Sequence, residues 1–272
     1  MGEHPDVDRI AVAGVQLEYT WFGPPPTAAP TIVFLHEGLG SLGLWGDFPE
    51  AVCRETGCGG LVYSRRGHGH SDPLDRPHDA RFMHDEAQIV LPRLLEAFRI
   101  SDMILVGHSD GGSIALIYTG AGLGRPRGLV LEAPHVFNED RIVTGIAEVR
   151  TRYERGTLRS RLARHHGSNT DDIFNAWANV WMNPDFRDWN IEEYLPGVKA
   201  PTLVIQGIDD EYGTEGQVHA IKAAIGGPCE TLMVPDCGHL PHLDQREVVE
   251  AATTNFVARL WSRDREAAGG RR

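Results

Sequence analysis

Residues 107–111 carry the clearest chemical pattern of the chain, because their sequence Gly-His-Ser-Asp-Gly matches G-x-S-x-G. They follow the apolar run 103–106 and precede a helical pattern that begins after Gly112. A strand, a sharp turn and a helix are the context in which this pattern forms a nucleophile elbow. A serine hydroxyl is a weak nucleophile at neutral pH and needs a base beside it. The pattern therefore predicts Ser109 as a nucleophile.

An acid and a base follow the serine in the order that such a mechanism needs. The apolar strand expected at 201–206 leads into a turn that carries Asp209 and Asp210, and the strand expected at 230–234 ends shortly before His239. Ser, Asp and His in this order are typical of hydrolases that use the elbow. All three positions follow strand ends, which is where open α/β sheets place their sites. We therefore expect His239 to take the proton of the serine.

The elements around these residues alternate between strands and helices. The pattern predicts a hairpin over 10–22 and an amphipathic helix over 82–98 that Pro92 kinks or delays. It also predicts a closing helix over 245–261, and further strands at 31–35, 60–64 and 128–132. Such alternation predicts a mostly parallel sheet with helices on both faces.

Residues 135–198 interrupt this alternation with helical patches around 142–153 and 171–182. An insertion between two strands at the catalytic edge of a sheet predicts a lid. We therefore divide the chain into a first core part (1–134), a helical lid insertion (135–198) and a second core part (199–272). Four aromatic residues of the insertion could either line a pocket or pack the insertion's own core: Phe174, Trp177, Trp181 and Trp189.

Composition excludes several classes of protein. The chain has 272 residues, enough for one large core with an insertion, and a net charge of −12 without the basic stripe that nucleic acids require. No apolar run approaches about 18 residues, so we expect no membrane span. The polar N-terminus has no signal-peptide core, which predicts a cytoplasmic location.

The four cysteines have no spacing typical of a disulfide framework, so we expect free thiols in a reducing compartment: Cys53, Cys58, Cys229 and Cys237. Cys237 lies two residues before His239 and is a rival nucleophile. It ranks below Ser109 because no elbow surrounds it, and a small packed side chain is the simpler interpretation.

With these motifs in place, the chain resembles the α/β-hydrolase superfamily from residue 36 to about residue 260. The matching segments are 36–38, 66–71, 107–111, 207–210 and 238–239. More narrowly, it is similar to the lid-bearing, cofactor-free esterases and C–C bond hydrolases. The resemblance implies the α/β-hydrolase fold: a mostly parallel eight-stranded sheet with helices on both faces and an inserted helical lid.

The resemblance also implies roles for individual residues. The pattern G-x-x-D makes Asp210 the acid of the triad, with Asp209 and then Glu132 as rivals. The backbone N–H groups of Gly38 and Asp110 would form the oxyanion hole. The residues expected in a substrate pocket are Leu39, His135, Trp177, Trp181, Tyr212 and Leu240.

Two positions depart from the usual pattern of these relatives. Glu37 stands where they carry glycine, and a carboxylate in an oxyanion hole would oppose the developing charge. We therefore expect Glu37 to face away, either paired with Arg65 or solvated at the rim. Asp110 follows the nucleophile, and its charge either favours cationic or hydrogen-bonding substrates or is engaged by His135 or Arg65.

The sequence predicts neither a metal site nor a cofactor. The histidine pair at 165–166 has no carboxylate or cysteine at ligand spacing, and no G-x-G-x-x-G follows a first strand. His68 and His70 belong to a motif that the resemblance assigns to a structural loop. The expected partner is a small-molecule substrate, with no nucleic acid and no membrane; a homodimer is left open.

The function expected from these features is hydrolysis of a small carboxylic ester or lactone through an acyl-enzyme. Two alternatives stay open. One is a C–C bond hydrolase or cofactor-free lyase of the same fold, of the menaquinone-pathway or meta-cleavage-product type. The other is a non-catalytic receptor for a small molecule, which would keep the triad and use the pocket only for binding.

Overall fold

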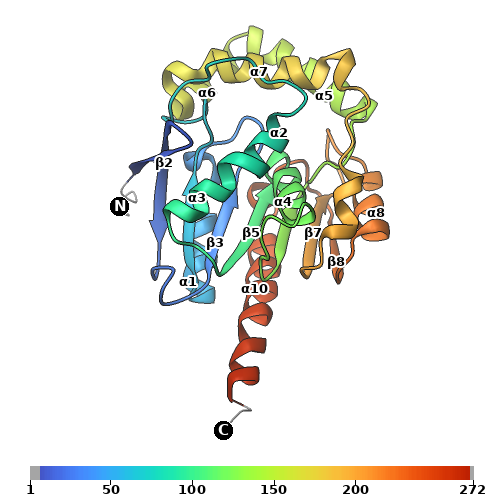
Figure 1. Cartoon of the computed structure of the whole chain (residues 1–272). Helices are drawn as coiled ribbons and strands as arrows, with labels where there is room; N and C mark the ends of the chain where they lie inside the picture. The colour runs from blue at the N-terminus through green and yellow to red at the C-terminus, as the bar shows by residue number, and fades with distance from the viewer. Residues whose placement is uncertain (1–6, 270–272) are drawn as a thin grey trace.

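The computed structural model describes residues 7–269, with side chains as far as Trp261. Its centre is an eight-stranded sheet with the strand order β1-β2-β4-β3-β5-β6-β7-β8 (Figure 1). The first two strands are antiparallel to their neighbours, and the others run parallel. The strands are β1 (Asp8–Val12), β2 (Val15–Phe22), β3 (Thr31–Leu35), β4 (Gly59–Tyr63), β5 (Met103–His108), β6 (Leu129–Glu132), β7 (Thr202–Gly207) and β8 (Cys229–Val234). The predicted sheet is therefore confirmed.

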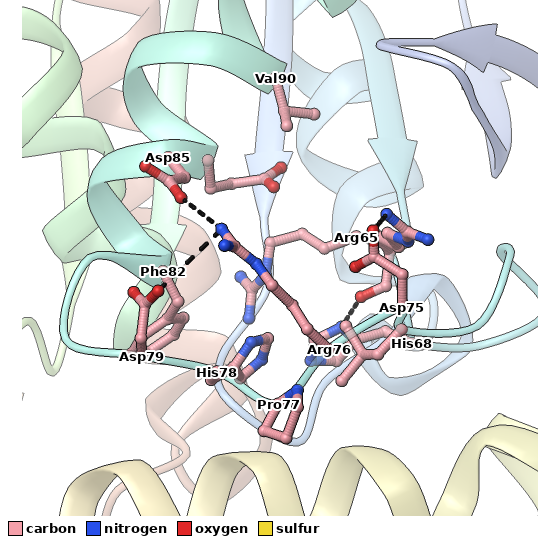
Figure 2. Close-up of a pocket in the computed structure, with 13 residues that line it drawn as sticks. Arg65, His68, Asp75, Arg76, Pro77, His78, Asp79, Phe82, Asp85 and Val90 are labelled. Atoms are coloured by element: carbon pink, nitrogen blue, oxygen red, sulfur yellow. Dashed lines mark hydrogen bonds and ion pairs between the residues drawn. The ribbon is translucent and has the colours of Figure 1, made fainter.

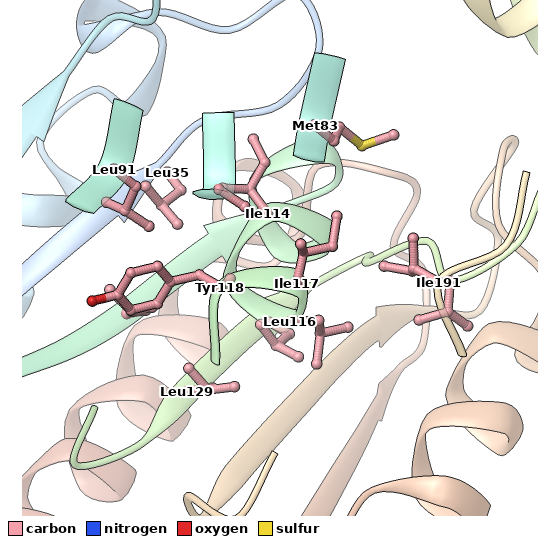
Figure 3. Packing of buried hydrophobic residues seen from close by; sticks show 14 of the residues in the cluster. Leu35, Met83, Leu91, Ile114, Leu116, Ile117, Tyr118, Leu129 and Ile191 are labelled. Atoms are coloured by element: carbon pink, nitrogen blue, oxygen red, sulfur yellow. The ribbon is translucent and has the colours of Figure 1, made fainter. Parts of the chain in front are cut away.

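Helices cover both faces of this sheet because its central strands are apolar on both sides. Ile32 and Phe34 of β3 pack in one buried cluster with α1 (Phe48–Thr56) and α10 (Arg246–Gly269). Leu35, from the same strand, packs on the other face with α4 (Asp110–Gly120). Figure 3 shows this second cluster, in which Ile114 and Tyr118 of α4 pack with leucines of neighbouring elements. Two packed faces hold the strand ends rigidly, and these ends carry the site.

The helix expected over 82–98 forms with an irregular centre. It consists of α2 (Phe82–Asp85), a π-helical turn η2 (Glu86–Val90) and α3 (Leu91–Ala97). Pro92 lies in the first turn of α3, where its missing N–H costs little. The predicted break at Pro92 therefore occurs as a π-helical turn that ends just before it.

Between β6 and β7 the chain forms three helices that lie across the C-terminal edge of the sheet (Figure 1). They are α5 (Asp140–Glu154), α6 (Thr157–His166) and α7 (Thr170–Met182). Two match the expected patches, whereas α6 was not anticipated because it has few apolar residues. The domain boundaries at 135 and 198, and the opening of this insertion as a lid, stay predictions.

Short elements complete the core. They are α8 (Glu215–Ala224), α9 (Pro241–Asp244), and the 3₁₀ segments η1 (Leu42–Trp45), η3 (Gly167–Asn169), η4 (Pro184–Phe186) and η5 (Glu192–Gly197). Within the residues that the structure describes, no helix combines the length and apolar character needed to cross a membrane.

Candidate active site

Ser109 lies at the sharp turn between β5 and α4 with φ 52° and ψ −117°. This left-handed conformation is rare outside glycine and costs about 1–3 kcal/mol, which the surrounding structure must offset. The turn is also tightly packed. A Cβ on Gly107 would lie 2.4 Å from the carbonyl oxygen of Gly111, and one on Gly111 would lie 1.9 Å from that of Leu35. Glycine is therefore required at both flanking positions of the pattern.

The structure brings Ser109, His239 and Asp210 into one hydrogen-bonded chain. The Nε2 atom of His239 lies 2.9 Å from the Ser109 Oγ, and its Nδ1 lies 2.8 Å from the Asp210 Oδ2. Because a carboxylate only accepts, Nδ1 donates to it, which leaves Nε2 free to accept the serine proton. The arrangement has the geometry of a serine nucleophile, a base and an orienting acid.

Asp210 is buried, yet its surroundings favour the charged form. Its Oδ1 accepts from the backbone N–H groups of Tyr212 and Gly213, at 2.7 and 3.0 Å, and its Oδ2 also accepts from Gln206 at 2.6 Å. Burial alone would raise the pKa of Asp210, but His239 and these backbone donors hold it well below its usual range. The side chain is therefore an ionised acceptor for the histidine.

The two rival acids lie elsewhere. Asp209 is exposed to solvent. Glu132 is fully buried at the end of β6, and its Oε2 accepts from the Nδ1 and the backbone N–H of His242, at 2.8 and 3.2 Å. Burial lowers the pKa of His242, but the charge of Glu132 outweighs this and raises it. Glu132 therefore pairs with a different histidine, one that packs 4.7 Å from the Trp45 ring.

The two expected oxyanion-hole residues both line the cavity that Ser109 faces. Asp110 is the first residue of α4, so its N–H has no partner within the helix. Gly38 lies on the loop after β3, where a Cβ would lie 2.3 Å from the Trp177 ring and 3.0 Å from the Asp110 carboxylate. A glycine therefore lets this loop lie close to both neighbours.

The Glu37 side chain does not pair with Arg65, its expected partner. Its Oε2 lies 3.3 Å from the Nδ1 of His108, while Arg65 donates to the backbone carbonyls of His36 and Glu37. Burial would raise the pKa of Glu37, but the hydrogen bond and charge of His108 lower it to about 2. The Nε2 of His108 in turn lies 2.7 Å from the carbonyl oxygen of His239. His108 therefore connects the Glu37 loop to the histidine loop.

Asp110 has the opposite electrostatic surroundings to Asp210. Its carboxylate is 1% exposed and 3.9 Å from the Arg65 guanidinium. Its Oδ2 has no hydrogen-bond partner among the described residues. Burial raises the pKa of Asp110 to about 6, although the charge of Arg65 opposes the rise. Of the two neighbours expected to engage it, Arg65 forms the ion pair.

The cavity beside Ser109 has a volume of about 350 Å³. All six residues expected in the pocket line it: Leu39, His135, Trp177, Trp181, Tyr212 and Leu240. Burial lowers the pKa of His135 to about 3, so this imidazole is neutral beside His239, at 5.5 Å between ring centres. Phe174 and Trp189 instead pack among other aromatic rings of the insertion.

Other residues that line the cavity were not predicted from the sequence, and they come mostly from α5 and α6. Ile142, Ile146 and Val149 recur at helical spacing on α5, a signal that could have identified them. The polar sequence of α6 has no clear apolar face that would predict its residues in the cavity wall. The missed residues are Leu44, Ile142, Ile146, Val149, Arg152, Leu158, Arg161, Leu162, Arg164, His165 and Glu211.

A second cavity of about 350 Å³ borders Arg65 and contains none of the three residues Ser109, His239 and Asp210 (Figure 2). Arg76 extends across it toward Asp79 and Asp85, at 4.0 and 3.3 Å. Since this arginine is already paired with acids of the same wall, the cavity offers no open charge for a ligand.

Neither the cysteines nor the histidines form an alternative centre. All four cysteines are free, and burial raises the pKa of the Cys237 thiol to about 12, which disfavours a nucleophilic thiolate. Across residues 7–269, no group of three or more histidine, cysteine or acidic side chains has the arrangement of a metal site.

Comparison with known proteins agrees with the fold. The alpha/beta hydrolase family model matches residues 32–252. The chain is 32% identical over 227 residues to a non-heme chloroperoxidase, CPO-A1, of Kitasatospora aureofaciens, covering 73% of this chain and 79% of the relative. It is 28% identical over 245 residues to the human serine hydrolase BPHL, covering 86% and 80%.

Among solved structures, an enol-lactonase from Burkholderia xenovorans superposes with a TM-score of 0.70 at 21% identity, covering 92% of this chain and 99% of that one. A thermophilic esterase from Thermogutta terrifontis gives a TM-score of 0.72 at 18% identity, covering 94% and 99%. The matched family model, the relatives and the shared sheet lead to one conclusion: the chain belongs to the alpha/beta hydrolase family, and the protein is a hydrolase.

Proposed function

We propose that the protein hydrolyses small carboxylic esters or lactones through an acyl-enzyme on Ser109. The observation that carries this proposal is the hydrogen-bonded chain Ser109–His239–Asp210, which opens into a cavity of about 350 Å³. Leucine, isoleucine, valine and tryptophan side chains form part of the cavity wall and suit the uncharged body of an ester. The name of the human relative, a serine hydrolase, also supports a serine nucleophile.

In this mechanism each group of the site has one role. As Ser109 Oγ attacks the carbonyl carbon, its proton passes to Nε2 of His239, and the carbonyl oxygen gains a negative charge. The N–H groups of Gly38 and Asp110 stabilise that oxyanion. The Nε2–H then protonates the leaving alkoxide, and water hydrolyses the acyl-enzyme by the reverse sequence. Asp210 keeps the imidazole in the required tautomer.

The test is hydrolysis of p-nitrophenyl acetate and butyrate by the purified protein, followed by a series of lactones and dienone acids. Turnover of esters or lactones that Ser109→Ala abolishes, with burst release of nitrophenol as the acyl-enzyme forms, is the expected result. Turnover restricted to dienone acids would identify a C–C bond hydrolase instead. Tight binding of these compounds without any turnover would identify a receptor.

A further inference from the structure

Three arginines of the cavity wall have no partner in the part of the chain that the structure describes. Arg152 lies on α5, and Arg161 and Arg164 lie on α6; all three are exposed at the cavity. None of them makes an ion pair or side-chain hydrogen bond within the described residues. Two other arginines of the same helices, which lie outside the cavity, do have partners: Arg150 donates to Asn179, and Arg159 forms two hydrogen bonds with Asp171.

Two of the three acids of the same cavity have an arginine or imidazole partner. The carboxylate of Glu37 lies 3.3 Å from His108, and that of Asp110 lies 3.9 Å from Arg65. Glu211 accepts from the backbone N–H of His239 at 3.2 Å, a bond that leaves its negative charge unpaired within the described residues. The three arginines without a partner therefore outnumber the one unpaired carboxylate of the cavity wall. Such a local excess of positive charge attracts anions and raises their rate of entry.

Apolar side chains lie on α5 between Gly145, beside the site, and Arg152. Ile142, Ile146, Val149 and Arg152 share one face of α5 at spacings of four, three and three residues. The beginning of this face lies near the catalytic centre, since a Cβ on Gly145 would lie 2.9 Å from Tyr212. The Tyr212 ring in turn packs 4.7 Å from that of His239.

Arg152 lies two helical turns beyond Gly145, about 10 Å along the axis of α5. On α6, Leu158 and Leu162 line the cavity together with Arg161. The neighbouring α6 residue His166 lies 2.9 Å from the Leu39 carbonyl, which fixes this helix against the loop after β3. The cavity wall thus combines Ser109, apolar side chains of α5 and α6, and three arginines of the same two helices.

We infer that the substrate is an amphiphilic ester or lactone with an anionic group, a carboxylate or phosphate, joined to the reacting carbonyl by an apolar segment. The anion binds Arg152, Arg161 and Arg164, while the segment packs against α5 and α6. This inference rests on the proposed esterase function and names its substrate class. Binding of the anion by these arginines would also orient the ester toward the nucleophile.

The experiment uses matched esters that differ in one charge. The acyl-side pair is mono-p-nitrophenyl suberate and its methyl ester; the alcohol-side pair is 4-carboxyphenyl octanoate and its methyl ester. Calorimetry with Ser109→Ala protein measures the Kd of each intact ester without turnover, and wild-type kinetics measures kcat/KM. A phosphate-bearing octanoate ester, compared with its carboxylate counterpart, distinguishes the two anions.

The expected result is tighter binding and a higher kcat/KM for the charged member of at least one pair. Single Arg→Gln substitutions at 152, 161 and 164 should each reduce this preference roughly three-fold, and the triple variant roughly thirty-fold, because exposed ion pairs are individually weak. Raising the salt concentration should reduce the wild-type preference as well. Arg141→Gln, an exposed α5 substitution outside the cavity, is the matched control.

The outcomes separate the two proposals. Equal Kd values for charged and neutral members of both pairs, or a preference that survives in the triple variant, would overturn the anionic substrate class. Tighter binding of the charged esters, without hydrolysis of any ester by the wild-type protein, would overturn the esterase function. It would still support anion binding by the three arginines. Circular dichroism and thermal melts establish that each variant is folded.

Discussion

Two buried aspartates of the site show how strongly surroundings set the chemistry of one residue type. Asp210 accepts from Gln206, from His239 and from two backbone N–H groups, which favour its charged form. Asp110 has Arg65 as its ion-pair partner at 3.9 Å, and burial favours its neutral form. The first is thus fixed as an ion, whereas the second changes its charge within the working pH range of most enzymes.

The first residue-scale prediction concerns the nucleophile. Ser109→Ala should reduce kcat by more than about 10³-fold, since the remaining groups of a triad contribute little without the nucleophile. The fold should persist because the change removes a single hydroxyl. Steady-state kinetics on p-nitrophenyl butyrate, together with a thermal melt, measures both effects. A variant within ten-fold of the wild-type rate would contradict the serine mechanism.

The second prediction separates two adjacent carboxylates. Asp210→Asn should reduce kcat by up to about 10⁴-fold, because an amide favours the wrong imidazole tautomer. Asp209→Asn should leave kcat close to the wild-type value, since this exposed side chain does not contact His239. Purified variants compared on one ester give the answer. If the ranking is reversed, the acid is Asp209; if both variants are active, Glu132 requires the same test.

The third prediction is a pH dependence of stability. Burial raises the pKa of Asp110 from 3.8 to about 6. The folded state therefore holds this proton more tightly than the unfolded state, and the stabilisation, roughly 3 kcal/mol, is lost as the pH rises through about 6. In Asp110→Asn this loss is absent. The free energy of unfolding of the variant relative to wild type should thus increase between pH 4 and pH 7.

Urea denaturation at several pH values measures that difference, with Asp209→Asn as the exposed control. A difference between Asp110→Asn and wild type that stays constant from pH 4 to pH 7 would mean that the buried carboxyl does not titrate in this range.

Residue identities and their order along the chain could be predicted from sequence, whereas several side-chain partners could not. The elbow pattern and the strand ends suffice to group Ser109, Asp210 and His239, since parallel strands end at one edge of the sheet. The pairing of Glu37 with His108 was not foreseen, because it depends on how the loop after β3 turns toward the end of β5. Arg65 was the expected partner because it lies on an adjacent strand-end loop, but its guanidinium is occupied by backbone carbonyls.

At the scale of elements, the strand–turn–helix from β5 to α4 depends on the absence of a side chain. A Cβ on Gly111 would lie 1.9 Å from the Leu35 carbonyl oxygen, a backbone atom that cannot move without shifting β3. We expect Gly111→Ala to destabilise the protein by about 2 kcal/mol or more and to reduce activity. Thermal melts and ester kinetics check both expectations.

Gly43→Ala is the control for this substitution. Its added Cβ would meet only the flexible His165 side chain, at 3.3 Å. If the two alanine variants were equally stable, close packing would not explain the glycine of the elbow.

One helix of the insertion between β6 and β7 could not be predicted from the sequence pattern. Helices α5 and α7 have apolar faces and were expected, whereas α6 has many arginines and histidines and only two apolar residues in the cavity wall, Leu158 and Leu162. Tertiary contacts decide the position of such a helix, for example the contact of His166 with the Leu39 carbonyl. Such a contact joins residues far apart in the chain and leaves no local pattern in the sequence.

At the scale of the whole molecule, the proposed reaction needs only side chains and backbone groups of the chain itself. We therefore predict that dialysis against EDTA leaves ester hydrolysis unchanged within the error of the assay. The measurement compares initial rates before and after chelation, with added zinc or manganese as a further arm. Activity that is lost on chelation and restored by a metal ion would contradict this prediction and point to the histidine clusters as metal ligands.

The order of the strands has a consequence for how the working enzyme arises. Ser109 and His239 are 130 positions apart, and the strands that carry them are separated in the sheet by β6 and β7. Closing so long a loop is entropically costly and makes pairing slow compared with local helix formation. Recovery of catalysis after dilution from denaturant should therefore lag behind recovery of helical circular dichroism. The hydrolytic rate is then a reporter of the last, non-local step of folding.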